Sequence, residues 1–276
     1  MTDVFCNAII KDNHCQRICM SFPLSVSFQR KEIYYILYQK GFFVMRMNLN
    51  EILDAIYHSI VVSCQALPDE PLYCEEMSLM PFMAQAAKQA GAKCIRTSSV
   101  RDIAAIKEKT GLPVIGLIKR KYEGFDSYIT PTMREIDELV AVESDIVALD
   151  CTGLKRGDGL SINEFIAKIK DKYPDIALMA DISTLEEGLN AWKCGVDIVG
   201  TTMSGYTPFS RQAEGPDFAL AKGLAEQVTI PVIAEGKIHS PQQAKEMLAT
   251  GVHAIVVGGA ITRPLEIAAR FYQGIQ

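Results

Sequence analysis

Short apolar runs alternate with amphipathic helical patterns along most of the chain. From residue 60 onward, each run of β-branched and other apolar residues is followed by apolar positions spaced three and four apart. This alternation is typical of strand–helix units that build a parallel sheet. It predicts eight strands, over residues 60–63, 92–96, 114–119, 146–150, 177–181, 198–201, 232–234 and 254–257.

Residues that favour helix ends mark the segments between these strands. Ser161 with Glu164, and Ser183 with Glu186, have the spacing of a capping box, in which two side chains satisfy backbone N–H groups at a helix start. Ser240 followed by Pro241 is another signal for a helix start. Glycines stand just before several predicted strands, where the left-handed end of a helix favours them: Gly91, Gly111, Gly195 and Gly251.

The number of strand–helix units predicts the fold class. Eight units in a chain of 276 residues favour an α/β fold, a closed (β/α)8 TIM barrel of the phosphate-binding type, because such barrels take about 250 residues. A doubly wound open sheet is the alternative. It is disfavoured because Ser63-Cys64-Gln65-Ala66 follows the first predicted strand, in place of the glycine-rich turn of dinucleotide-binding sheets.

Residues 1–46 do not share this pattern. Cysteine and aromatic residues are scattered there without a helical or strand period, and the first clear helical pattern covers residues 48–57. We therefore divide the chain into an N-terminal extension, 1–46, and a catalytic barrel, 47–276. Met45 and Met47 precede that helix, which suggests a native start near them and an extension that is non-native or dispensable. A peripheral helix near residues 33–37 is the alternative.

Charge and composition disfavour several classes of protein. A formal net charge of -5 without a basic run argues against nucleic acid or an anionic membrane as a partner. No apolar stretch of about 20 residues and no secretory signal stand out, so we expect a cytoplasmic protein. The 8 cysteines form no Cys-x-x-Cys pair, and no second ligand pair follows His14, Cys15 and Cys19. Neither a metal nor another cofactor is therefore expected.

Polar residues close the predicted strands. In barrels of this kind the active site lies at the C-terminal ends of the strands. Charged side chains there cost free energy unless they line a polar pocket. For any single one of these residues, a solvent-exposed position in a loop is the alternative. The residues are Gln65, Arg96, Lys119, Asp150, Asp181, Thr201, Glu235 and Gly258. Because no histidine joins them, acid–base chemistry by Lys119, Asp150 and Glu235 is favoured over metal-assisted chemistry.

Glycines after the seventh and eighth predicted strands indicate a phosphate site. Gly236, and Gly258 with Gly259 ahead of a final helix, let backbone N–H groups approach an anion closely. Arg263 adds a forked, charge-assisted donor. The alternative for a glycine pair alone is a tight turn. The loop after the sixth strand, with Tyr206 and Arg211, is either a lid over the substrate or a surface loop.

Several segments in this order resemble the bacterial N-acetylmannosamine-6-phosphate 2-epimerases. They lie between about residues 60 and 270 and read VVSCQAL (61–67), IGLIKR (115–120), YITPT (128–132), MADIST (179–184), GTTMSGYT (200–207) and VGGAITRP (257–264). The resemblance implies interconversion of N-acetylmannosamine 6-phosphate and N-acetylglucosamine 6-phosphate, a step in bacterial use of sialic acid. The expected partner is thus a small phosphorylated amino sugar, and a homodimer is one candidate assembly.

The resemblance also implies residue roles. The proposed acid/base of that family falls on Lys119, and two further acids of the family fall on Asp150 and Glu235. Cys151 departs from the alanine expected there, which is a small change. Asp181, Thr201 and Tyr206 are expected to contact the substrate. Ligand-binding positions of the first two strands, followed by the phosphate loop, fall on Gln65, Arg96, Gly236, Gly258, Gly259 and Arg263.

A proton-transfer hypothesis follows for Lys119. A lysine with its ordinary pKa of about 10.4 is mostly protonated at neutral pH and is a poor base. Burial and Arg96 would lower that pKa whereas Glu235 or Asp150 would raise it, and the balance stays open here. Lys119 would shuttle the proton, the two acids would assist ring opening or proton return, and Arg96 would stabilise negative charge.

Other functions compete with this hypothesis. Another phosphate-binding barrel enzyme, such as a pentose-phosphate epimerase or a thiamine-phosphate synthase, would need a metal or pyrophosphate pattern that the strand ends do not offer. A non-catalytic sugar-phosphate sensor is the alternative from a different class. The presence of both Lys119 and Glu235 argues against it.

Overall fold

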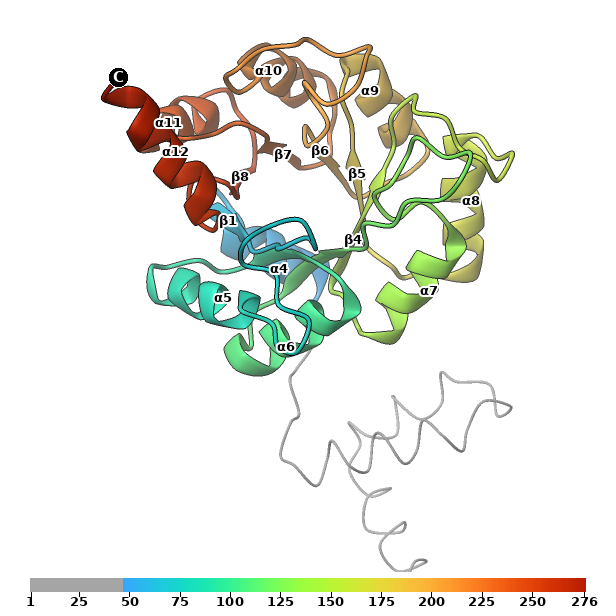
Figure 1. Ribbon diagram of the computed structural model, residues 1–276. Helices are drawn as coiled ribbons and strands as arrows, with labels where there is room; N and C mark the ends of the chain where they lie inside the picture. Colours follow the sequence, from blue (N-terminus) through green and yellow to red (C-terminus); the bar gives the residue numbers. More distant parts are fainter. Residues whose placement is uncertain (1–46) are drawn as a thin grey trace, which may run out of the picture. The chain divides into compact units, whose positions relative to one another are not determined.

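The computed structural model describes residues 47–276. Our expectations for residues 1–46, including the helix near 33–37 and the grouping of His14, Cys15 and Cys19, lie outside the described residues. Eight parallel strands form a closed barrel in chain order (Figure 1), which confirms the predicted fold class. They are β1 (Ile60–Ser63), β2 (Ile95–Ser98), β3 (Val114–Leu117), β4 (Ile146–Asp150), β5 (Leu178–Asp181), β6 (Ile198–Gly200), β7 (Val232–Glu235) and β8 (Ala254–Val257).

Helices follow every strand and surround the barrel (Figure 1). The helix α4 (Leu49–Ile56) precedes β1, as predicted for residues 48–57. The others are α5 (Met80–Gln89), α6 (Val100–Thr110), α7 (Met133–Ala141), α8 (Ile162–Lys172), α9 (Leu185–Lys193), α10 (Phe218–Gln227), α11 (Pro241–Leu248) and α12 (Pro264–Gly274). None of the helices within 47–276 is long and apolar enough to cross a bilayer.

The core has two layers because side chains alternate along each strand. Val62 faces outward into the layer between strands and helices, whereas its neighbour Val61 faces the barrel interior. The interior layer also contains Ile52 and Ile56 of α4, so this helix covers the end of the barrel at which the strands begin. The opposite end of the barrel, where the strands finish, is not covered by α4 and is available for an active site.

Two strand predictions need correction. The strand β2 begins at Ile95 rather than at 92, because the backbone N–H of Ala92 still bonds Ala87 in the turn that ends α5. It continues to Ser98, so Arg96 lies within the strand rather than at its end. The strand β3 ends at Leu117, and Lys119 lies in the segment that follows it.

The predicted helix ends are mostly confirmed. The capping box of Ser161 and Glu164 starts α8, and Ser240 caps α11 through the N–H of Gln243. The box predicted for Ser183 and Glu186 is wrong by one residue, because Thr184 has the extended backbone of an N-cap and pairs with Glu187. The four glycines before strands are all left-handed, with φ of 114° at Gly91, 65° at Gly111, 84° at Gly195 and 94° at Gly251.

Candidate active site

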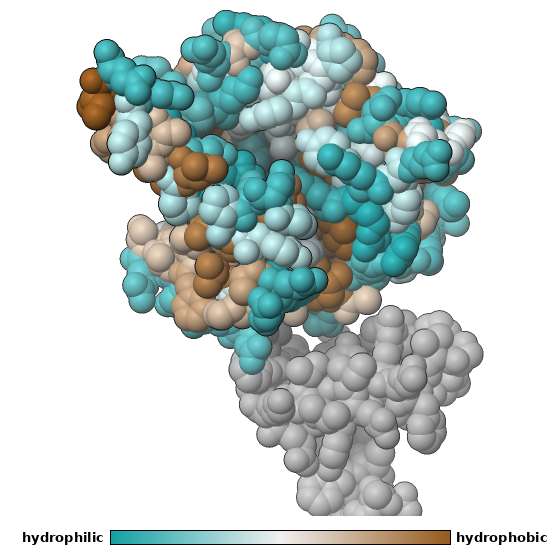
Figure 2. Space-filling view, viewed as in Figure 1, coloured by the Kyte–Doolittle hydropathy of each residue, from teal (hydrophilic) through white to brown (hydrophobic). Residues whose placement is uncertain are grey.

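A polar cavity of about 340 Å³ opens at the C-terminal ends of the strands. The face of the barrel seen in Figure 2 is mostly hydrophilic around this mouth. Most of the residues predicted for the site line the cavity, and they come from every quarter of the barrel except the β4–β5 side. They are Gln65, Arg96, Lys119, Tyr206, Glu235, Gly236, Gly258, Gly259 and Arg263.

Arg96 lies at the centre of a buried charge cluster. Its side chain is 1% exposed and reaches Asp181 Oδ2 through Nη2 at 2.5 Å and Glu235 Oε2 through Nε at 3.0 Å. The hydroxyl of Thr202 donates to Asp181 Oδ1 at 2.7 Å and lies 3.2 Å from Glu235 Oε2. These contacts join β2, β5 and β7 across the barrel, so the fold itself fixes the position of the guanidinium.

Burial and pairing decide the charge states in this cluster. Burial opposes charge on Arg96, but the carboxylates of Asp181 and Glu235 outweigh it and raise the pKa of the guanidinium above its ordinary value. Burial also raises the pKa of Glu235, against the opposing effect of Arg96. Glu235 can therefore hold a proton at a higher pH than an exposed glutamate.

Lys119 is the cation of the cavity that has no partner. Its backbone N–H donates to Ser98 Oγ at 3.3 Å, but no residue within 47–276 forms a hydrogen bond or an ion pair with Nζ. Burial, followed by the charges of Arg263 and Arg96, lowers the pKa of its amine, whereas Glu235 and Glu70 act against that shift. The balance that the sequence left open thus lies below the ordinary pKa of a lysine.

Three predicted site residues do not line the cavity. Asp150 is 3% exposed, and its Oδ1 accepts hydrogen bonds from Thr152 N and Oγ1 at 2.9 and 2.6 Å. The carboxylate of Asp181 forms an ion pair with Arg96. Thr201 Oγ1 donates to the carbonyl of Glu235 at 2.9 Å and so ties β6 to β7. None of the three side chains lines the cavity, and Asp150 Oδ2 is buried without a hydrogen-bond partner among the described residues.

The predicted phosphate end is built around close backbone approaches. A side chain at Gly259 would collide with the carboxylate of Glu266, and a Cβ at Gly258 would lie 3.2 Å from Ser63 Cβ. Arg263 lines this end but is already paired, to Glu70 Oε1 at 3.0 Å and to Glu266 Oε1 at 3.0 Å. An anion that binds here must compete with two carboxylates.

The loop after β6 contributes to the cavity through one of its two predicted residues. Tyr206 is 57% exposed and lines the cavity, whereas Arg211 does not. Lys237 Nζ lies 5.2 Å from the centre of the Tyr206 ring and donates to the carbonyl of Ala213 at 2.5 Å. Lys237 therefore attaches this loop to the end of β7.

Several lining residues escaped the prediction, which considered only strand ends and glycine loops. They are Ser63 at the end of β1, Glu266 in α12 and, in loops, Glu70, Tyr128, Thr202, Lys237, His239 and Thr262. Tyr128 and Thr202 stand in segments that resemble the epimerases, so that resemblance was the available signal. Lys237 directly follows Gly236 and has a left-handed backbone with φ of 57°, which the residue type does not indicate.

Comparisons with known proteins agree with this geometry. A sequence model of the NanE family, described as "Putative N-acetylmannosamine-6-phosphate epimerase", matches residues 80–276. The chain belongs to this family. A relative named "Putative N-acetylmannosamine-6-phosphate 2-epimerase", from Caldanaerobacter subterraneus subsp. tengcongensis, is 49% identical over 221 residues, which is 80% of this chain and 92% of the relative. A relative of the same name from Clostridium perfringens is 50% identical over 219 residues, 79% of this chain and 97% of its own.

Solved structures extend the comparison. The N-acetylmannosamine-6-phosphate 2-epimerase from Clostridium perfringens superposes with a TM-score of 0.77 and 48% identity, over 82% of this chain and 97% of that chain. A thiamine phosphate pyrophosphorylase from Pyrococcus furiosus has a TM-score of 0.52 and 21% identity, over 80% of this chain and 96% of that one. The second likeness shows a common fold and nothing about chemistry.

Proposed function

We propose that this member of the epimerase family interconverts N-acetylmannosamine 6-phosphate and N-acetylglucosamine 6-phosphate. The observation that carries the proposal is the partly buried Lys119 amine, unpaired among the described residues, in a cavity of about 340 Å³. About half of the residues aligned over about 80% of the chain are identical to those of proteins named as this epimerase. Inversion at C2 needs a base of this kind, because the carbon bears a hydrogen beside the carbonyl of the ring-opened sugar.

Proton abstraction is assigned to Lys119. The neutral amine takes the hydrogen of C2 as a proton, and the electron pair of that C–H bond forms the C1–C2 double bond of an enolate, with the charge on O1. Arg96 has a pKa held above its ordinary value and remains a cation, so it can stabilise that charge. The fixed ion pairs of Arg96 mean that little reorganisation is needed as the charge develops.

Proton return to the other face of C2 needs an acid. Glu235 fits this role, because it lines the cavity and burial raises the pKa of its carboxyl. Asp150 is assigned a supporting role, since its carboxylate lies within the barrel wall and not in the cavity. Asp181 is assigned to holding Arg96, and Thr201 to holding the backbone of Glu235.

Substrate binding is assigned to the two ends of the cavity. The buried Oε1 of Gln65 has no hydrogen-bond partner, so it is available to a donor on the substrate. Gly236, Gly258, Gly259 and Arg263 would receive the phosphate, which would displace a carboxylate from Arg263. The ring of Tyr206 would cover the sugar.

Assembly and location are also proposed. The helix α12 has no buried residue, and Leu265, Phe271, Tyr272 and Ile275 on it are exposed. Figure 2 shows hydrophobic residues along it. A second copy of the chain that covers α12 would form a homodimer, which sedimentation at several concentrations tests.

A cytoplasmic location is supported by the five described cysteines, all of which are free.

Proton NMR in heavy water tests the activity. The purified protein is incubated with N-acetylmannosamine 6-phosphate without added metal, and C2 of both sugars is followed. We expect N-acetylglucosamine 6-phosphate that carries deuterium at C2. Product without deuterium would contradict proton exchange with solvent. Binding without any conversion would instead favour the sugar-phosphate sensor or another sugar phosphate as substrate.

A further inference from the structure

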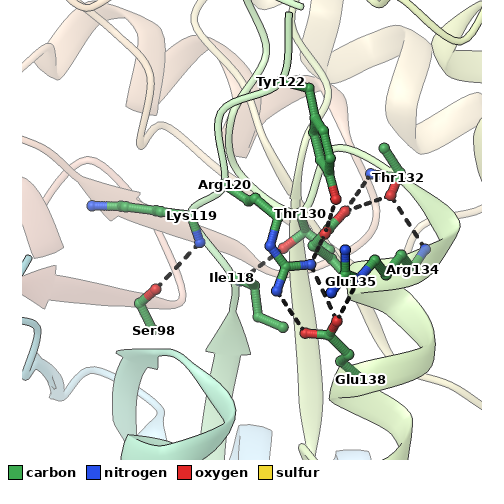
Figure 3. A network of polar contacts seen from close by, with 10 residues as sticks. All are labelled: Ser98, Ile118, Lys119, Arg120, Tyr122, Thr130, Thr132, Arg134, Glu135 and Glu138. Atoms are coloured by element: carbon green, nitrogen blue, oxygen red, sulfur yellow. Dashed lines mark hydrogen bonds and ion pairs between the residues drawn. The ribbon is translucent and has the colours of Figure 1, made fainter.

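A second charge cluster lies on α7, outside the set of residues that line the cavity (Figure 3). Its centre is Glu135, whose side chain is 0% exposed. One carboxylate oxygen, Oε1, accepts from Arg120 Nη1 and from the hydroxyl of Tyr122 at 2.8 Å. The other oxygen accepts from Thr132 N at 3.0 Å and Thr132 Oγ1 at 2.6 Å. Both oxygens of the buried Glu135 carboxyl group therefore have hydrogen-bond donors.

Other helices of the barrel show what a capping box needs by itself. Glu135 is the third residue of α7 and completes the box with Thr132. Glu51 in α4 and Glu164 in α8 occupy the same place, but both are exposed and bond only the residue that caps their own helix. The bonds to Arg120 and Tyr122 are therefore additional to starting the helix.

Arg120 connects this cluster to the cavity. It directly follows Lys119, and the two side chains leave the backbone on opposite sides, Arg120 toward α7 and Lys119 toward the barrel (Figure 3). Arg120 also bonds Glu138 through Nη2 at 2.9 Å, so two carboxylates of α7 hold its guanidinium. Forked contacts of this kind restrict both distance and direction.

The backbone around Lys119 is held by a short bridge. Arg120 N donates to Tyr128 O at 2.9 Å, and Thr130 N donates to Ile118 O at 2.7 Å. These two hydrogen bonds fix the position of residues 118–120 relative to the end of β3. The Arg120 side chain also attaches this segment to α7. Because no described residue bonds Lys119 Nζ, the position of the amine depends on these backbone anchors.

We propose that Glu135 and Arg120 are positioning residues that hold Lys119 at the reacting carbon. The inference rests on the proposed role of Lys119 as the base. Neither residue touches the cavity, so each acts through the backbone of residue 119. A shift of about 1 Å in a reacting group can cost about 100-fold in rate. The loss should therefore appear in kcat, while KM depends on Gln65 and the phosphate end.

Loosening Lys119 would also change its electrostatic surroundings. The charged groups that act on its amine are Arg263 and Arg96, which disfavour the ammonium form, and Glu235 and Glu70, which favour it. Burial is the largest of the effects that lower its pKa. An amine that moves toward solvent loses that effect, so its pKa rises toward the ordinary lysine value.

The experiment compares Arg120→Ala, Arg120→Lys and Glu135→Gln with a matched control. Glu164→Gln makes the same exchange in the capping box of α8, where no residue of a strand end is attached. We expect kcat to fall about 10- to 100-fold in Arg120→Ala and Glu135→Gln, with KM within about threefold of the parent. Arg120→Lys keeps the charge without the fork and should retain more of kcat than Arg120→Ala. Glu164→Gln should leave kcat unchanged.

The dependence of kcat/KM on pH separates positioning from simple stabilisation of the helix. In Arg120→Ala the rising limb should move to higher pH, and Glu164→Gln should not move it. An unchanged kcat and an unmoved limb in folded Arg120→Ala, with Lys119→Ala inactive, would overturn the positioning role and leave the proposed function intact. Full activity of Lys119→Ala would overturn both. If Glu135→Gln does not fold, the two Arg120 variants decide, because that side chain is 29% exposed and tolerates exchange.

Discussion

Arg96 and Lys119 face the same cavity from neighbouring strands, and their surroundings are opposite. Arg96 is held by two carboxylates and a hydroxyl network that join three strands. Lys119 has no described partner for its amine and is held through its backbone. Both side chains are largely removed from water, so burial alone does not distinguish them.

The difference shows how pairing decides the protonation state of a buried cation. Burial disfavours the charged form of both groups. Asp181 and Glu235 outweigh this effect at Arg96, whereas at Lys119 the charges of Arg263 and Arg96 add to it. A paired guanidinium thus serves as a fixed charge, whereas an unpaired amine loses its proton more readily than the amine of an exposed lysine.

Removing the unpaired amine should have the largest effect on turnover. In Lys119→Ala we expect kcat to fall about 10²- to 10⁴-fold, because a general base contributes a factor of that order. Binding of N-acetylglucosamine 6-phosphate, measured by calorimetry, should stay within a few fold, since the phosphate end of the cavity is untouched. An equal loss of binding and turnover would show that Lys119 contributes to affinity instead of proton transfer.

Removing the paired cation should lower stability as well as turnover. Arg96→Met leaves Asp181 and Glu235 buried without their partner, which costs about 3–5 kcal/mol of the free energy of unfolding in comparable buried pairs. Urea denaturation measures this loss. The matched control is Arg134→Ala, which breaks the exposed pair with Glu138 and should cost only about 0.3–0.5 kcal/mol. A loss below about 1 kcal/mol in Arg96→Met would mean that the carboxylates find other partners.

Removing neighbours of opposite charge should shift the pH profile of kcat/KM in opposite directions. If neutral Lys119 is the base, kcat/KM rises with pH and levels off below the ordinary lysine pKa, because the folded environment lowers that pKa. Arg263→Met removes a cation that disfavours the ammonium form, so the pKa and the rising limb should move to higher pH. Glu70→Gln removes an anion that favours it, so the limb should move to lower pH.

A distant pair provides the control for these profiles. Glu226 pairs with Lys222 on the exposed face of α10, with both side chains 63% exposed, so Glu226→Gln changes the net charge by the same amount as Glu70→Gln without reaching the cavity. The rising limb of kcat/KM in Glu226→Gln should coincide with that of the parent protein. Movement of the two limbs in the same direction in Arg263→Met and Glu70→Gln would show that a group other than Lys119 controls the profile.

The smallest expected effect concerns the loop after β6. Lys237 over the ring of Tyr206 is a cation–π contact of about 0.5–1 kcal/mol at an exposed site, which corresponds to about a 2- to 5-fold change. Tyr206→Ala should raise KM by that factor, because the loop loses the ring contact with Lys237, while the bond from Lys237 to the carbonyl of Ala213 remains. Tyr206→Phe keeps the ring and should not. Equal KM values in both variants would mean that the tyrosine hydroxyl, and not the ring, matters.

Local patterns predicted the barrel and much of the cavity. The order of strands and helices follows from periods of two and 3.6 residues, and the caps of α8 and α11 follow from side chains three residues apart. Lys119 and the glycines after β7 and β8 were found because the barrel places strand ends in one mouth. These signals are short-range, so the sequence contains them without knowledge of the closed structure. The assignment of residues 1–46 stays a prediction.

Contacts between distant segments decided the rest. Asp150, Asp181 and Thr201 are polar strand-end residues like Glu235, yet they do not line the cavity. Asp150 bonds Thr152 two residues away, whereas Asp181 and Thr201 reach Arg96 and the carbonyl of Glu235 on other strands only when the barrel closes. The pKa of Lys119 depends likewise on burial and on charges from four other loops and strands. Electrostatic energies vary with the distance between groups and with their access to water, and the chain sets both only when the barrel closes.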